Sequence, residues 1–168
     1  MGKIEGSWSG MRKFLEEETI AASLRGRVRY NCTTYVGMDG CRVFEIFVDN
    51  EVIKRFSWET VNSDFIEMGY VKKTRPMNIG DYWDGYWDAL KKYPMEARTE
   101  YTDEEFCAAL EGYRNQSIQK SVYSKNPIVK MFALLDKRVG RRTLEKIEEE
   151  IHSQPEWVRF FYEVRCNR

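Results

Sequence analysis

The sequence predicts an α+β protein, in which an N-terminal helix and a three-stranded antiparallel sheet precede an antiparallel cluster of helices. Apolar and polar residues alternate over 27–36, which is the period of a half-exposed strand. From residue 102 onward, apolar residues recur instead at helical spacing. No helical pattern separates the first three strands, and a parallel pair would need a crossover connection, so the sheet is expected to be antiparallel.

In the first half we expect a helix over 8–24 and strands over 27–36, 42–48 and 51–58. Asp49-Asn50 tolerates positive φ and predicts a tight hairpin between the second and third strands. With a two-residue loop, Glu45 would lie opposite Lys54 and Phe47 opposite Val52.

The stretch 59–79 has no clear period, and Phe65, Ile66 and Met68 fit either a short helix or a fourth strand. Its basic end, 72–76, is typical of a solvated loop.

The second half predicts a series of helices, most of them with recognisable ends. Thr102 and Glu105 form a capping box, and Asn126-Pro127 opens another helix that Gly140 ends. The expected helices cover 80–93, a segment from 102, 116–123, 126–140, a segment around 144–151, and a segment from 155. We expect a helix-plus-sheet lobe over 1–79 and a helical lobe over 80–168, joined in one compact unit.

Composition narrows the class of protein. Lys plus Arg and Asp plus Glu each number 27, and this balance argues against a protein that coats nucleic acid by bulk charge. Aromatic residues reach 14%, which indicates either a ring-rich core or an aromatic binding surface.

The cysteines and the apolar runs point to the cytoplasm and not to a membrane. Cys32, Cys41, Cys107 and Cys166 are widely spaced without a CxxC pair, so reduced thiols are expected. No run approaches the roughly 18 apolar residues of a membrane-spanning helix. Residues 1–10 lack the apolar run of a signal peptide.

The sequence contains none of the common catalytic motifs. His152 is the sole histidine, which excludes a two-histidine metal site. There is no phosphate-binding glycine loop and no GxSxG nucleophile motif. We therefore expect no cofactor, and the sequence leans away from an enzyme.

An acidic cluster is the one weak metal candidate. Asp84 and Asp88 are four residues apart, so on a helix they would lie on the same face, close to Asp81. Two carboxylates placed in this way could bind Mg²⁺, with water molecules completing its coordination. An ordinary solvated face gives the same pattern.

The aromatic run over 82–87 also has two interpretations. Tyr82, Trp83, Tyr86 and Trp87 recur at helical spacing, so they could fill the core. Alternatively, part of the stripe is exposed, and Trp83, Tyr86 and Trp87 are then candidate partner-binding residues, because Trp and Tyr concentrate at interface hot spots.

Two groups of arginines are candidate sites for acidic ligands. Arg138, Arg141 and Arg142 surround a helix–glycine–helix junction, where they could bind a partner's phosphate or carboxylate or simply complement a helix dipole. Arg27, Arg29 and Tyr35 could form a weak nucleic-acid platform on the sheet, or an ordinary wet sheet face.

Several segments, taken together, show a family resemblance: Leu24–Tyr30, Phe44–Asp49, Asn126–Leu144 and Trp157–Glu163. The chain resembles a family of small uncharacterised bacterial proteins, common in Gram-positive bacteria and on mobile elements. The resemblance covers both ends of the chain and includes no catalytic motif. It implies a bacterial cytosolic setting and no site residue.

The leading hypothesis is a non-enzymatic interaction protein that binds a protein or a protein–nucleic-acid assembly through aromatic and Arg-rich surfaces. A narrower version is an inhibitor of a bacterial defence nuclease, of the anti-CRISPR type. The alternatives are a Mg²⁺-dependent nuclease that uses the Asp cluster and a structural homodimer that buries the aromatic helix. The sequence leaves the oligomeric state open.

Overall fold

The computed structural model describes residues 6–34, 41–71 and 79–167 and confirms the predicted α+β class. Its first half contains α1 (Trp8–Lys13), a π-helical turn (Phe14–Glu18), a 3₁₀ turn (Ala22–Leu24), β1 (Val28–Thr34), β2 (Arg42–Val48), β3 (Glu51–Phe56) and α2 (Trp58–Glu67). The second half contains α3 (Ile79–Lys92), a 3₁₀ turn (Met95–Ala97), α4 (Asp103–Asn115), α5 (Ile118–Val122), α6 (Pro127–Leu135), α7 (Arg141–His152) and α8 (Glu156–Cys166).

The sheet is antiparallel with strand order β1-β2-β3, as predicted. Asp49 and Asn50 have φ values of 51° and 73°, which confirms the two-residue hairpin. Phe47 lies opposite Val52, also as predicted. The expected pairing of Glu45 with Lys54 is wrong.

A β-bulge at Ile53 explains that error. It shifts the register by one residue, so that Glu45 lies opposite Arg55 and Lys54 opposite Ile46. The shift turns Lys54 and Phe56 toward the buried face, where Phe56 is 0% exposed. Burial of this ring in the core therefore sets the register, which the turn alone could not specify.

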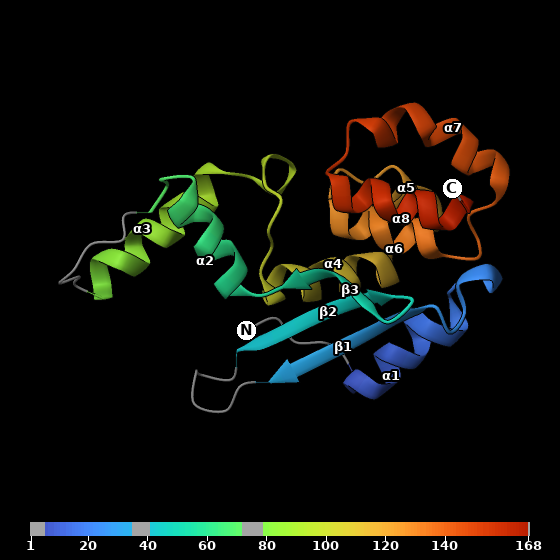
Figure 1. Cartoon of the computed structure of the whole chain (residues 1–168), viewed down its shortest axis with the longest axis horizontal. Helices are drawn as coiled ribbons and strands as arrows, with labels where there is room; N and C mark the ends of the chain where they lie inside the picture. Colours follow the sequence, from blue (N-terminus) through green and yellow to red (C-terminus); the bar gives the residue numbers. More distant parts are fainter. Residues whose placement is uncertain (1–5, 35–40, 72–78, 168) are drawn as a thin grey trace.

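The main core lies between the sheet and the helices, and it absorbs most of the rings. α4 packs against β2 and β3, and α6 packs against α4, α5 and α8 (Figure 1). Phe106 of α4 stacks on Phe44 with centroids 4.4 Å apart and lies 4.9 Å from Phe56 and 5.5 Å from Phe132. The high aromatic content thus reflects in large part a ring-rich core.

The N-terminal helix is shorter than the predicted 8–24. α1 ends at Lys13 and continues as the π-helical turn, from which Glu16 accepts a hydrogen bond from the backbone N–H of Tyr30 at the edge of β1 (2.7 Å). Ile20 then leaves the helix to pair with Asp136. Pairing across the fold has overridden the local helical pattern.

The same pairing ends α6 at Leu135 rather than at Gly140. Asp136 is 1% exposed, and its carboxylate accepts hydrogen bonds from the Tyr113 hydroxyl and from the Arg138 guanidinium (Nη2 to Oδ2, 2.6 Å). The start of α6 and the capping box of Thr102 are confirmed.

The stretch 59–79 resolves in favour of a helix, and its basic end falls outside the described residues. α2, α3 and Val71, which follows α2, form a second, smaller apolar cluster of Val61, Phe65, Val71, Tyr86 and Ala89. In Figure 1 this helix pair, here called the α2–α3 arm, extends away from the sheet and the other helices. The backbone N–H of Ser57 donates to the carbonyl of Tyr101 (3.0 Å), which joins the two connections of the arm.

Gly85, inside α3, offers a stability test of the arm. A Cβ added there meets no atom within 4 Å, whereas Gly26 has a φ of +79°. Because Ala has a higher helix propensity than Gly, we expect Gly85→Ala to stabilise the protein by about 0.5–1 kcal/mol in denaturant unfolding. Gly26→Ala is the matched control, expected to destabilise by about 1 kcal/mol. If Gly85→Ala destabilised the protein, the space found around the added Cβ in α3 would be contradicted.

The cysteines are free thiols, and Cys107 is buried. Burial raises the pKa of the Cys107 thiol to about 11, so the folded state holds this proton more tightly than the unfolded state. Its stabilising contribution is therefore complete below pH 9 and is lost as the pH rises toward 11. We expect Cys107 to resist alkylation in the native protein at pH 8 and to react after unfolding, as measured by mass spectrometry. Native alkylation as fast as that of Cys41 would contradict its burial.

None of the helices in the described part of the chain is long and apolar enough to span a membrane.

Candidate functional site

The aromatic run of α3 divides between core and surface. Tyr86 is 1% exposed and Tyr82 is half-buried, whereas Trp83 and Trp87 are 36% and 50% exposed. Sequence reasoning treated the four rings as one stripe, and the structure separates an inward Tyr row from an outward Trp row. Of the predicted partner-binding residues in this helix, Trp83 and Trp87 are accessible and Tyr86 is not.

The buried contacts below the two indoles fix their position. Tyr86 lies 5.8 Å from the ring of Phe65 in α2, and the Tyr82 hydroxyl donates a hydrogen bond to the Asn62 side-chain carbonyl. Trp83 also lies 5.8 Å from Trp58, the first residue of α2. The helix that carries both indoles is therefore held against α2, and Trp83 has a ring contact there, which reduces the conformational entropy that binding at Trp83 would have to overcome.

The candidate metal ligands Asp84 and Asp88 lie on the solvent side of the Trp row and are exposed. Among the described residues, Asp88 forms one loose ion pair, with Lys91, at 3.8 Å and with both side chains 80% exposed. Within 6–34, 41–71 and 79–167, no three His, Cys, Asp or Glu side chains converge in a way that could hold a metal ion. The two carboxylates instead form an acidic border beside the indoles, and we call Trp83, Asp84, Trp87 and Asp88 the Trp–Asp face.

The three arginines around Gly140 have different environments. Arg138 is held by the buried Asp136, so part of its role is structural. Arg141 is 93% exposed and pairs with Glu145 (2.8 Å), and Arg142 is also exposed. Both occupy the first turn of α7, where the helix dipole disfavours cations, so the dipole explanation does not fit them. In Figure 1, α7 lies at the opposite end of the molecule from α3.

The candidate nucleic-acid residues Arg27 and Arg29 are engaged by the β2–β3 turn. Arg27 donates to both carboxylate oxygens of Asp49 (2.9 and 2.8 Å), and Arg29 donates to the Asn50 side-chain carbonyl (2.5 Å). Their charges and hydrogen-bond donors are thus partly used within the fold. Tyr35 lies outside the described residues.

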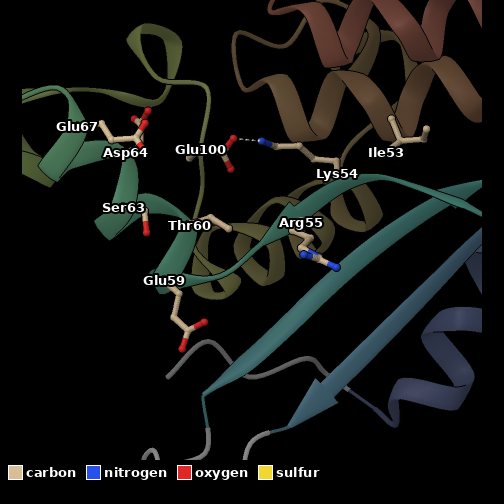
Figure 2. A pocket seen from close by; sticks show the side chains of 9 residues that line it. All are labelled: Ile53, Lys54, Arg55, Glu59, Thr60, Ser63, Asp64, Glu67 and Glu100. Carbon is tan, nitrogen blue, oxygen red and sulfur yellow. Dashed lines mark ion pairs between the residues drawn. The ribbon is translucent and has the colours of Figure 1, made fainter.

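A cleft of about 510 Å³ lies between β3, α2 and the segment that leads to α4 (Figure 2). Its lining is rich in carboxylates and comprises Ile53, Lys54, Arg55, Glu59, Thr60, Ser63, Asp64, Glu67 and Glu100. Arg55 is paired with Glu45 (2.7 Å), which reduces the positive charge available to the cleft.

Lys54 reaches from β3 toward Glu100, with Nζ 2.8 Å from Oε1, and also donates to the carbonyl of Thr99 (2.7 Å). Burial lowers the pKa of Lys54, and the hydrogen bond to Glu100 partly opposes that effect. The same pair lines a neighbouring cleft of about 500 Å³ that continues to Trp157 and Phe160. This bond ties the outgoing and returning connections of the arm together.

Sequence reasoning missed two surface residues of the arm, Trp58 and Met68. Met68 is 59% exposed and Trp58 borders the Trp row. Met68 belongs to the stretch 59–79, for which the sequence left a helix and a strand open. Trp58 was predicted as the end of the third strand, but β3 ends at Phe56 and Ser57 caps α2, which begins at Trp58. The N-cap Ser57 and the apolar pair Val61 and Phe65, spaced four apart, are the signals that identify this helix.

These features define a small α+β protein with a projecting two-helix arm that displays exposed indoles. The chain belongs to the SF0329 protein family, whose model matches residues 7–166. Membership of an uncharacterised family agrees with the resemblance found in the sequence. No curated protein and no solved structure matches the chain.

Proposed function

We propose that this protein is a non-enzymatic interaction protein that binds a partner protein through the Trp–Asp face of its α2–α3 arm. The observation that carries the proposal is the exposure of Trp83 and Trp87, 36% and 50%, on successive turns of one helix. Indole is the side chain most enriched at binding hot spots, and adjacent exposed rings form an apolar patch of the kind that marks interaction sites.

The architecture of the arm supports the same function. Its apolar cluster holds Tyr86 and Phe65 inside, so the exposed indoles are not needed to fill the main core. The helix pair projects from the rest of the fold (Figure 1), and the side chains of the Trp–Asp face are exposed, so a partner can reach them.

The charges beside the indoles favour a protein over a nucleic acid at this face. Asp84 and Asp88 would repel phosphates, because nucleic-acid binding depends on neutralising them with cations. A nucleic-acid component of a larger assembly would have to contact another region, such as the exposed Arg141 and Arg142.

The setting of this function is part of the proposal. A bacterial, cytoplasmic protein on a mobile element, acting as an inhibitor of a defence nuclease of the anti-CRISPR type, is its narrower form. Co-purification with a Cas nuclease and loss of DNA cleavage would support that form, and unchanged cleavage at excess protein would remove it.

The test of the broader proposal is affinity capture from a lysate of the host organism, with and without nuclease. We expect the wild type to retain a stoichiometric protein that Trp83→Ala/Trp87→Ala loses, since truncating a hot-spot residue reduces affinity by about 30-fold or more. Tyr123→Ala is the matched control, because Tyr123 is 47% exposed but lies at the end of α5, and it should retain the partner. Recovery of no stoichiometric macromolecule, or equal recovery by all variants, would overturn the proposal.

A further inference from the structure

The chain repeats Tyr-Trp-Asp at 82–84 and again at 86–88. Since an α-helix has about 3.6 residues per turn, each residue of the first triplet lies almost directly over its copy in the second. The Tyr row faces the arm's cluster, the Trp row lies at its margin, and the Asp row faces solvent. The Trp–Asp face is therefore two parallel rows, one apolar and one acidic, about 6 Å from one turn to the next.

We propose that the Trp–Asp face receives a cationic amphipathic helix of the partner protein, an inference that rests on the function proposed above. The charge pattern carries this step. Asp84 forms no ion pair with any other residue in the described ranges, and the loose contact of Asp88 with Lys91 contributes little. Asp84 can therefore bind a basic group directly, and the contact of Asp88 with Lys91 is loose enough for a partner's basic group to replace it.

The indoles reinforce the preference for cations. The face of an indole ring attracts Lys and Arg, and a carboxylate one position away adds Coulombic attraction in the same place. A partner side chain with an apolar stem and a basic head could therefore contact both rows at once, with its stem on the ring and its head on the carboxylate.

The repeat of side chains along α3 favours a partner segment that is helical. Side chains four residues apart on a partner helix repeat about every 6 Å along its axis. This repeat matches the distance between successive residues within the Trp row and within the Asp row. An extended strand would bring backbone N–H and C=O groups that the side of a helix cannot pair.

The packing of the arm leaves room for a helix as a third member. α2 and α3 pack on each other, and Trp58 of α2 lies beside Trp83 of α3. A helix laid along the Trp row would contact both and complete a three-helix bundle.

The test uses the full-length protein and two synthetic helices of about 18 residues, long enough to fold when bound. Both carry the same Leu row and a fluorescein label, and they differ only in having Lys and Arg, or Glu, in the flanking row. Fluorescence anisotropy is expected to show binding of the basic helix and at least about tenfold weaker binding of the acidic one.

Substitutions separate the contributions of the two rows. Asp84→Asn/Asp88→Asn should weaken binding of the basic helix about fivefold and flatten its salt dependence. Trp83→Ala/Trp87→Ala should weaken it by about 30-fold or more. The matched control, Glu111→Gln/Glu149→Gln, removes two exposed carboxylates outside the arm and should change neither.

Equal binding of the two helices, or unchanged binding after the Asp substitutions, would overturn the inference. It would also fall if light scattering showed a wild-type dimer that Trp83→Ala/Trp87→Ala dissolves, because the occupant would then be a second copy of this chain. If the basic helix fails but cellular capture still requires Trp83 and Trp87, the inference alone is lost and the proposed function stands.

Discussion

Phe106→Ala is expected to destabilise the protein by about 4 kcal/mol. The ring is 0% exposed and lies within stacking or edge-contact distance of Phe44, Phe56 and Phe132. Its removal takes away both the buried apolar area and the neighbours' contacts, and the surrounding rings cannot collapse to fill the gap. Urea unfolding followed by circular dichroism measures the change.

Trp87→Ala is the control for this substitution, because it also removes a large ring, but one that is 50% exposed. We expect its unfolding free energy to stay within about 0.5 kcal/mol of the wild type. A small loss of stability at Phe106 combined with a large loss at Trp87 would contradict the burial of Phe106 in the main core and the exposure of Trp87 on the arm.

Asp136→Ala is expected to destabilise the protein by about 3 kcal/mol. This carboxylate accepts hydrogen bonds from Tyr113 and Arg138 at the point where Ile20 pairs with the end of α6. Its loss would leave the Tyr113 hydroxyl buried without its partner and weaken the link between the N-terminal segment and the helices. Thermal and urea unfolding both report the change.

A double-mutant cycle with Tyr113→Phe distinguishes this network from a simple volume effect. The two substitutions should be clearly less than additive, because they remove the same hydrogen bond. Asp88→Ala, at an exposed aspartate, should have almost no effect. Strict additivity, or an equal loss at Asp88, would contradict the structural role of Asp136.

The parts of the fold that could be predicted from sequence are those with strong local signals. The period of β1, the Asp49-Asn50 turn, the capping box at Thr102 and the start of α6 at Pro127 each depend on residues close together in the chain. Local propensity and capping chemistry fix such features with little help from the rest of the fold.

The errors arose where distant contacts decide the structure. The burial of Phe56 sets the bulge in β3, and the pairing of Ile20 with Asp136 shortens both α1 and α6. The exposure of Trp83 could not be predicted for a similar reason. It depends on how α2, which had no assigned structure, packs beside α3.

The central claim is that Trp83 and Trp87 are exposed in the free protein and covered by the partner. Hydroxyl-radical footprinting with mass spectrometry, on the free protein and on the captured complex, tests it directly. We expect fast oxidation of both indoles in the free protein, strong protection in the complex, and unchanged oxidation of Tyr123. Slow oxidation in the free protein, or a complex in which both indoles stay as reactive as before, would contradict it.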